Sequence, residues 1–276
     1  MASTLKATPT ITVFRGSKNP GAYVWSPFVT KLETRLRFAS LPYRTDAGSP
    51  KSAPKGKIPY TTISEPHTSA AATSLADSGL IIEKLKENGF LHDLNAGLSC
   101  EQKAHDMALT ALLEDKLYFY QVYERWHENY HIMRANIFGF MPYPLQVLVG
   151  FLAYRSMSAA LYGQGTSRFA GGEISAFRKQ IWESFNALLV VSQRKSVAVG
   201  KRENSDSKLN RNDGLFWLLG GTEPSEVDAV LFAFVCSTLV CKAGPESREV
   251  VKSFPALLDY AERIHNRYFP DYAHWE

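Results

Sequence analysis

A hydroxyl-bearing residue stands where a helix is expected to begin, shortly after a strand. Residues 11–14 alternate like a strand, and residues 25–36 carry apolar side chains at helical spacing. Ser26 takes the N-cap position and Pro27 the first helical position, where no backbone N–H is required. A helix N-terminus presents unpaired N–H groups and the positive end of the helix dipole. This arrangement could hold an anion beside the Ser26 hydroxyl, and a thiolate is one candidate.

Two further features of the first ninety residues indicate special backbone geometry. Residues 58–63 alternate like a strand, but Pro59 cannot donate to a sheet ladder. A special turn, with a cis peptide as one option, explains that proline better. Asp77 and Ser78 lead into a second helix, which Asn88-Gly89 closes as a C-cap.

The character of the sequence changes near residue 95. The first ninety residues read β-α-β-β-β-α, whereas the rest shows only helix signals. A capping box of Ser99 and Gln102 opens a long amphipathic helix that reaches about residue 130. Further helices are expected over residues 144–162, 173–193 and 226–240, and from residue 254 onward. We therefore predict an α/β domain over residues 1–92 and an all-α domain over residues 99–276.

Two local signals refine the helical half. Ser225 and Asp228 form a second capping box before an apolar helix that we expect to be buried. Residues 194–213 are polar and charged, with no aromatic side chain, which predicts a mobile surface loop.

Composition narrows the class of protein. The chain has 276 residues, 45% of them hydrophobic, which suffices for two domains with a substantial core. A net charge of +4, spread along the chain, is too small to indicate a nucleic-acid partner. Three cysteines form no paired framework and favour a reducing compartment. The N-terminus lacks a signal-peptide core, and the most apolar run, residues 145–153, is too short to span a bilayer. We expect a soluble, cytoplasmic protein.

Four motifs, in this order, resemble the glutathione S-transferase superfamily. They are Ser26-Pro27-Phe28, Gly56-Lys57-Ile58-Pro59, Asp77-Ser78 and Ser225-x-x-Asp228. The sequence looks most similar to the failed-axon-connections and metaxin-like branch, whose members do not all have demonstrated transferase activity. A long loop over residues 16–25 supports that placement. The resemblance implies a thioredoxin-like N-terminal domain, a helical C-terminal domain, glutathione as co-substrate or cofactor, no metal, and a homodimer.

The resemblance also implies roles for single residues. Ser26 would donate to the glutathione thiol, with Ser17 and Tyr23 as the fallback hydroxyls. Since N-caps are commonly serine, Ser26 as a plain helix cap is the competing interpretation.

The remaining glutathione contacts are implied in the same way. The Ile58 backbone, beside a cis Pro59, would pair with the cysteinyl backbone of glutathione. Asp77 and Ser78 would hold the γ-glutamyl ammonium and carboxylate. Lys57 or Lys55 would meet the glycyl carboxylate, although a lysine-rich loop is usually just solvated.

An aromatic stripe is the candidate pocket for a small hydrophobic electrophile. Phe119, Tyr123 and Trp126 recur at helical spacing on the first helix of the helical half, with Tyr118 and Arg125 as polar contributors. The competing interpretation is that these rings are core, because aromatic side chains bury well in either place.

The motif His127-Glu128-Asn129-Tyr130-His131 is a competing chemical signal. On a helix, H-E-x-x-H places two imidazoles on one face for zinc, with the glutamate as general base. No downstream residue is an evident third ligand, and the motif lies near a predicted helix end, so a zinc hydrolase stays the remote alternative.

The reaction class follows from the sulfur that is present. No cysteine precedes Cys100, so the first domain has no protein thiolate for mixed-disulfide exchange. We therefore predict a glutathione transferase that adds glutathione's own sulfur to a small hydrophobic electrophile, or a glutathione-dependent isomerase. The alternative is a non-catalytic, metaxin-like adaptor, in which the same fold mediates protein or membrane-surface contacts. An exposed apolar patch over residues 144–153 would favour the adaptor.

Overall fold

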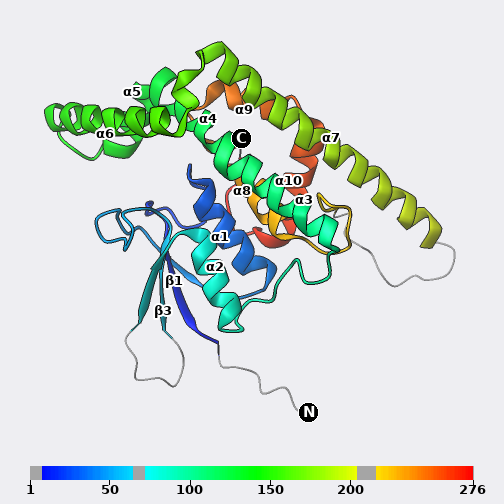
Figure 1. The fold of residues 1–276 in the computed structure, drawn as a ribbon. Coiled ribbons are helices and arrows are strands. Elements are labelled where there is room, and N and C mark those ends of the chain that lie inside the picture. Colours follow the sequence, from blue (N-terminus) through cyan, green and yellow to red (C-terminus); the bar gives the residue numbers. More distant parts are fainter. Residues whose placement is uncertain (1–7, 65–71, 204–215, 276) are drawn as a thin grey trace.

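The computed structural model of the chain describes residues 8–64, 72–203 and 216–275. A small sheet with two helices forms one part, and a larger assembly of helices packs beside it (Figure 1). The elements of the first part are β1 (Thr10–Phe14), α1 (Pro27–Phe38), β2 (Arg44–Asp46), β3 (Tyr60–Ser64), β4 (Thr73–Ala76) and α2 (Ser78–Glu87). Their order is the predicted β-α-β-β-β-α.

Helices make up the second part of the described chain. They are α3 (Cys100–Ala111), η1 (Leu112–Leu117), α4 (Tyr118–Tyr123), η2 (Glu124–Glu128), α5 (Tyr130–Phe138), α6 (Tyr143–Gln164), η3 (Thr166–Arg168), α7 (Gly171–Glu203), α8 (Glu226–Val240), α9 (Pro245–Lys252) and α10 (Pro255–Tyr268). The fold is thus a small α/β domain followed by a helical domain, which confirms the predicted fold class.

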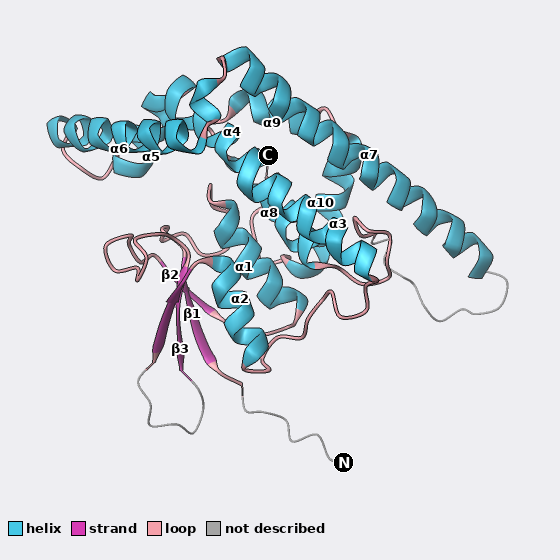
Figure 2. Ribbon diagram, viewed as in Figure 1, coloured by secondary structure: helices cyan, strands magenta, loops and turns pink. Residues whose placement is uncertain are grey.

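The sheet is mixed, and its strands run in the order β2-β1-β3-β4. Figure 2 shows the strands in magenta beside α1 and α2. β1 pairs in parallel with β2, and the connection between them contains α1. β3 pairs antiparallel with both β1 and β4. Since a crossover helix returns the chain to the start of the next parallel strand, the N-terminus of α1 lies at the end of the sheet where β1 finishes.

Helix α1 is buried between the sheet domain and α8. Nine of its twelve residues are buried. Leu32 and Leu36 join the sheet core with Ile11 and Val13. On its other side α1 packs along α8, of which residues 227–239 are all buried. Such burial is expected for α8, which is apolar around its whole circumference.

The charged residues of α1 reach the helical domain as ion pairs. Lys31 Nζ lies 2.6 Å from a Glu114 carboxylate oxygen on η1, and Arg35 Nε lies 2.8 Å from Glu226 at the start of α8. Buried charges are costly unless they are paired, so these contacts make the domain interface specific as well as tight.

A third pair involves the segment that follows α10. Glu33 of α1 lies 2.7 Å from Arg15 Nε and accepts a hydrogen bond from the Tyr272 hydroxyl at 3.0 Å. Burial raises the pKa of Glu33 to about 6, and the neighbouring Arg15 charge opposes that rise. The two ends of the described chain therefore meet around one buried carboxylate.

The predicted long helix after Ser99 is present but not uniformly α-helical. η1 and η2 are π-helical segments on either side of α4. A π-turn takes more residues than an α-turn, so each segment rotates the side chains that follow. Nothing in the local sequence indicated these segments.

The prediction of a loop over residues 194–213 is wrong for its first ten residues. α7 continues through Glu203, so residues 194–203 are helical. Lysine, arginine, alanine and glutamate in this stretch are good helix formers, and their polarity alone does not indicate a loop. The rest of the predicted loop lies outside the described residues.

Within the described ranges, no single helix is long and apolar enough to cross a membrane. Two bent pairs, α5 with α6 and α8 with α9, reach that criterion only when each pair is taken together.

Both predicted capping boxes are confirmed, and they differ in burial. Ser99 and Gln102 cap α3 at an exposed position. Asp228 is 0% exposed and accepts hydrogen bonds from the Leu218 N–H, the Ser225 N–H and hydroxyl, and the Tyr260 hydroxyl.

This difference yields a stability prediction. Asp228→Ala should lower the free energy of unfolding by about 3–5 kcal/mol, because it leaves several buried donors without an acceptor. Ser99→Ala should cost only about 1 kcal/mol. Urea denaturation of both variants measures the two losses. Equal losses would show that the buried hydrogen bonds of Asp228 add nothing to its role as a cap.

Candidate functional site

The predicted motifs of the first domain meet at one end of the sheet. Phe14, the last residue of β1, pairs with Tyr60, the first residue of β3, and Tyr60 pairs with Ala76, the last residue of β4. The chain that leads to α1, the Ile58–Pro59 peptide and Asp77 therefore all lie at the same sheet end as the start of α1.

The predicted cis peptide is confirmed between Ile58 and Pro59. The Pro59 carbonyl accepts a hydrogen bond from the Asp77 N–H at 3.3 Å, which joins two of the predicted binding segments directly. The Ile58 side chain packs over the backbone of Gly16, whose positive φ of 73° suits glycine. The strand-start segment is thus held against both the loop before α1 and the start of α2.

Ser26 occupies the N-cap position of α1 with an extended backbone, φ −87° and ψ 114°. Its side chain makes no capping hydrogen bond to the helix, and the residue is half-buried. An N-cap serine normally accepts from the N–H of the second or third helical residue. The plain-cap interpretation therefore lacks its hydrogen bond, and the donors of the first turn are not satisfied by this side chain.

A buried arginine from the helical domain reaches this helix start. Arg125 Nη1 donates to the carbonyl of Trp25, the residue before Ser26, at 2.9 Å, and Nη2 lies 3.4 Å from Gln121 Oε1. Arg125 is 5% exposed. Among the described residues its Nε has no hydrogen-bond partner, and no carboxylate lies within ion-pair distance. A buried cation without a counter-charge favours an anion nearby.

Tyr118, like Arg125, comes from the helical domain and contacts the start of α1. Its ring meets that of Phe28, in the first turn of α1, edge-to-face with centroids 4.9 Å apart. Burial raises the pKa of the Tyr118 hydroxyl, and the Arg125 charge partly opposes that rise. The phenol therefore stays protonated at neutral pH and can act as a hydrogen-bond donor.

Asp77 has an unusual conformation at the start of α2. Its φ is 83°, which L-residues rarely adopt, and its side chain accepts from the Gly79 and Leu80 N–H groups. A positive φ at a non-glycine residue is a feature that clusters at ligand sites. Asp77 is exposed, whereas Ser78 is only 3% exposed. The carboxylate is thus the more accessible of the two predicted contacts.

The other predicted contacts of the first domain lie at the surface. Lys55 and Lys57 are exposed on the loop before Ile58. Ser17 is half-buried, and its hydroxyl accepts from the Asn19 N–H at 3.3 Å within its own loop.

Tyr23, the other fallback hydroxyl, is buried among residues of the helical domain. Tyr23 is 7% exposed, and its hydroxyl lies 2.8 Å from His265 Nδ1 of α10. Its ring contacts Phe232, Phe269, Tyr272 and Trp275. Burial raises the pKa of the Tyr23 hydroxyl. The residue belongs to the core of the helical domain, and sequence could not show this because its partner lies 242 residues away.

The aromatic stripe packs as one cluster of the helical domain, in which Phe119 and Tyr123 lie against the buried Trp126. Trp126 is 6% exposed and packs with Val122 and Leu161, as the competing core interpretation expects. Tyr123 stacks on His127 with centroids 4.7 Å apart, and Phe119 contacts Tyr118. Of the predicted pocket residues, Tyr118 is the one whose ring packs against the first turn of α1.

The H-E-x-x-H segment does not form one helical turn. His127 lies in η2 and His131 in α5, with a break at Asn129, where φ is −122° and ψ is 35°. The His127 ring nitrogens lie 3.4 Å from the Tyr154 hydroxyl and 3.3 Å from the Ser158 hydroxyl. Burial lowers the pKa of His127. The helical spacing that would place both imidazoles on one face is therefore interrupted.

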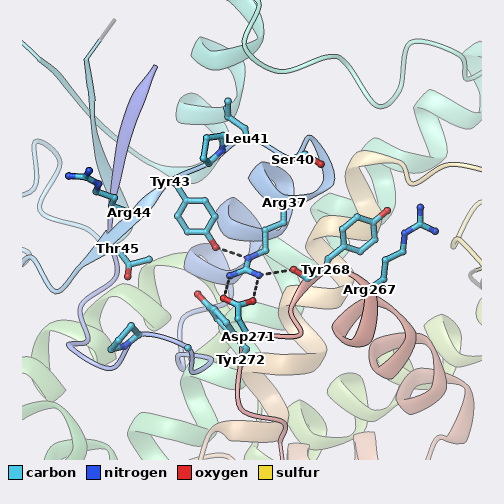
Figure 3. A pocket seen from close by; sticks show the side chains of 13 residues that line it. Arg37, Ser40, Leu41, Tyr43, Arg44, Thr45, Arg267, Tyr268, Asp271 and Tyr272 are labelled. Carbon is cyan, nitrogen blue, oxygen red and sulfur yellow. Dashed lines mark hydrogen bonds and ion pairs between the residues drawn. The ribbon is translucent and has the colours of Figure 1, made fainter. Parts of the chain in front are cut away.

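A separate pocket of about 950 Å³ lies at the opposite end of α1 (Figure 3). Arg37, near the C-terminus of α1, crosses it toward Asp271 and donates to the Tyr43 hydroxyl and the Tyr268 carbonyl. At 1.5 Å per residue, about 18 Å of helix separates this pocket from Ser26. Its arginine joins the two domains and is not part of the site at the helix start.

Family models match both parts of the chain. A model described as the glutathione S-transferase N-terminal domain matches residues 27–131, and one described as the glutathione S-transferase C-terminal domain matches residues 213–264. The chain is also 30% identical over 254 residues to the isoprene-epoxide–glutathione S-transferase of Rhodococcus sp. (strain AD45), covering 88% of this chain and 92% of that protein. The chain belongs to the glutathione S-transferase superfamily.

Further relatives place the chain near the branch expected from its motifs. Human metaxin-2 is 24% identical over 245 residues, covering 86% of this chain and 80% of metaxin-2. Failed axon connections of Drosophila melanogaster is 25% identical over 274 residues, covering 95% of this chain and 59% of that protein. This superfamily therefore contains both named transferases and metaxin-like proteins among the relatives of the chain.

A solved structure agrees with this membership at the level of fold. A glutathione transferase family member from Pseudomonas fluorescens Pf-5, crystallised with two glutathione molecules bound, superposes with a TM-score of 0.53 at 14% identity. The match covers 94% of this chain and 90% of that one.

The Tyr23–His265 contact yields a pH prediction. Burial lowers the pKa of His265, and the neighbouring His274 lowers it further. As the pH falls, the His265 imidazole takes up a proton near pH 6.5 in the unfolded chain, but only at lower pH in the folded chain. His265 should therefore destabilise the fold as the pH drops below about 6.5. His265→Gln should remove this contribution, so its free energy of unfolding should lose less, relative to the parent, between pH 7 and pH 5.

Comparison with the parent isolates this histidine. Glu33 acts in the opposite direction, since its raised pKa makes stability fall as the pH rises from 4.5 to about 6. His105→Gln, at an exposed position on α3, is the matched control and should keep the parent slope. An unchanged slope in His265→Gln would show that His265 does not titrate in this range.

Proposed function

We propose that the chain is a serine-type glutathione transferase that acts in the cytoplasm on a small hydrophobic electrophile. One observation carries the proposal. The Ser26 hydroxyl makes no capping hydrogen bond at the start of α1. The helical domain places beside it the buried Arg125, which has no carboxylate within ion-pair distance among the described residues. Both features suit a bound thiolate, and membership of the superfamily supports glutathione as its source.

The chemistry begins with the thiol. An unperturbed thiol has a pKa of about 8.5 and is mostly protonated at neutral pH. A hydroxyl donor, the N–H groups of the first turn and the Arg125 charge all favour the deprotonated sulfur. Each unit by which they lower the pKa corresponds to about 1.4 kcal/mol of preferential thiolate binding.

Binding of the tripeptide would use the end of the sheet described above. We assign the cysteinyl backbone to Ile58 beside cis Pro59, and the γ-glutamyl group to Asp77 and the start of α2. Support comes from the register that aligns these segments and from the hydrogen bond between Asp77 and Pro59. Lys57, exposed on the preceding loop, is assigned to the glycyl carboxylate.

An epoxide is the electrophile class that we favour. The Rhodococcus relative is named for an epoxide substrate. In such a reaction the sulfur forms a bond to one epoxide carbon, the carbon–oxygen bond breaks, and the resulting alkoxide takes up a proton. Tyr118, whose raised pKa keeps it protonated, is a suitable donor to that oxygen.

A non-catalytic, metaxin-like adaptor is the second candidate. The human metaxin-2 relative and an exposed apolar surface on α6 favour it. The two candidates differ in whether the helix start binds glutathione.

Isothermal calorimetry with reduced glutathione separates them. The parent chain should bind in the micromolar to millimolar range, and Asp77→Asn should bind more weakly. Asparagine tolerates the positive φ and keeps an acceptor for the cap, so the fold should be preserved while the charge is lost. Glu87→Gln, at an exposed carboxylate on α2, should bind as the parent does. No heat at millimolar glutathione would favour the adaptor.

Replacing Ser26 tests the thiol site itself. Ser26→Ala should reduce turnover of an epoxide at least about tenfold, with little change in glutathione affinity, and should shift the pH–rate profile toward higher pH. Ser17→Ala, which removes the other serine hydroxyl of the same loop, should behave like the parent. Equal losses of binding and turnover in Ser26→Ala would assign Ser26 a structural role instead.

A further inference from the structure

Helices α5 and α6 project from the helical domain as an arm (Figure 1). α6 packs on α5, η2 and η3, yet most of its large apolar side chains face outward. Phe140 and Tyr143, at the turn into α6, are 81% and 69% exposed, and Leu148 and Leu152 are 58% and 56% exposed. Contiguous apolar exposure of this kind marks an interaction surface.

The exposed residues of α6 form one stripe. Leu145, Leu148, Leu152, Ala159 and Tyr162 recur at helical spacing and are all exposed, whereas Gln146, Gly150 and Leu161 on the opposite side are buried. The outward stripe is thus as apolar as a core face, and α6 is apolar around its whole circumference.

The charged side chains of the arm itself have a single sign. Residues 129–172 contain no aspartate or glutamate, but they contain Arg134, Arg155 and Arg168. Arg155 is exposed within the apolar stripe. Arg168, just beyond α6, is exposed and lies over the Tyr162 ring at 5.3 Å. Arg134 of α5 is half-buried, and it lies over the Tyr143 ring at 5.7 Å and beside Gly150.

We propose that the α5–α6 arm binds the surface of an anionic lipid bilayer, with the α6 stripe lying in the headgroup region. Apolar side chains flanked by arginine and tyrosine suit this boundary, where rings and aliphatic stems bury while cations stay with the headgroups. Anionic lipids attract each basic residue near the surface.

A second copy of this chain fits the arm less well. A symmetric contact through α6 would bring like charges together, since residues 129–172 of each copy carry arginines and no acidic residue. A spanning arrangement fits less well too, because α5 and α6 meet at 118° and neither helix alone meets the criterion for crossing a membrane.

Vesicle flotation of the full chain tests the proposal. The protein should float with vesicles of phosphatidylcholine and phosphatidylglycerol, bind vesicles of phosphatidylcholine alone at least about fivefold more weakly, and lose affinity as salt is raised. Leu148→Glu and Leu152→Glu should each weaken binding about tenfold or more. Leu80→Glu, at a leucine of α2 that is 51% exposed, is the matched control and should bind as the parent does.

Charge variants and light scattering complete the test. Arg155→Glu should weaken binding about fivefold or more, whereas Lys179→Glu, at an exposed lysine of α7, should not. Loss of flotation with the anionic vesicles, equal binding to both vesicle types, or insensitivity to the α6 variants would each overturn the proposal. A dimer that Leu148→Glu converts to a monomer would assign the stripe to a second copy instead. Glutathione binding is measured separately and decides none of these outcomes.

Discussion

Burial of α1 between the sheet and α8 is the constraint on which the rest of the molecule depends. A helix with a polar outer face would be solvated in an isolated α/β domain, but here its charged residues lie inside the structure. Lys31 and Arg35 pair with residues of the helical domain, and Glu33 pairs with Arg15 and Tyr272. Because each buried charge needs its partner, the two domains have one favourable arrangement, and the front of α1 is fixed with it.

The candidate site inherits its precision from that arrangement. The first domain supplies a helix start, a cis proline and an aspartate at one end of the sheet, all set by strand register. The helical domain supplies Arg125 and Tyr118, which reach the residues on either side of Ser26. Both side chains reach the helix start only because the two domains pack together.

Local signals predicted the fold well, because strands, caps and the cis proline are encoded within a few residues. Ser99 and Ser225 capped helices as their spacing indicated, and the fold class was confirmed. Contacts between residues far apart in the chain could not be predicted from the sequence. Arg125 meets the Trp25 carbonyl across 100 positions, and Tyr23 is buried by a residue 242 positions away. The π-helical segments also carry no local signature, although counting did group Phe119, Tyr123 and Trp126, which pack in one cluster.

The contact between Glu33 and Tyr272 has a consequence for how the chain is made. These partners are 239 residues apart, so a ribosome produces α1 long before the hydroxyl that its glutamate needs. Until Tyr272 has been synthesised, the Glu33 carboxylate lacks this hydrogen-bond donor, so solvent exposure is more favourable for it than burial. Docking of α1 against the helical domain is therefore expected to follow synthesis of residue 272, and the helix start at Ser26 should reach its final surroundings only then.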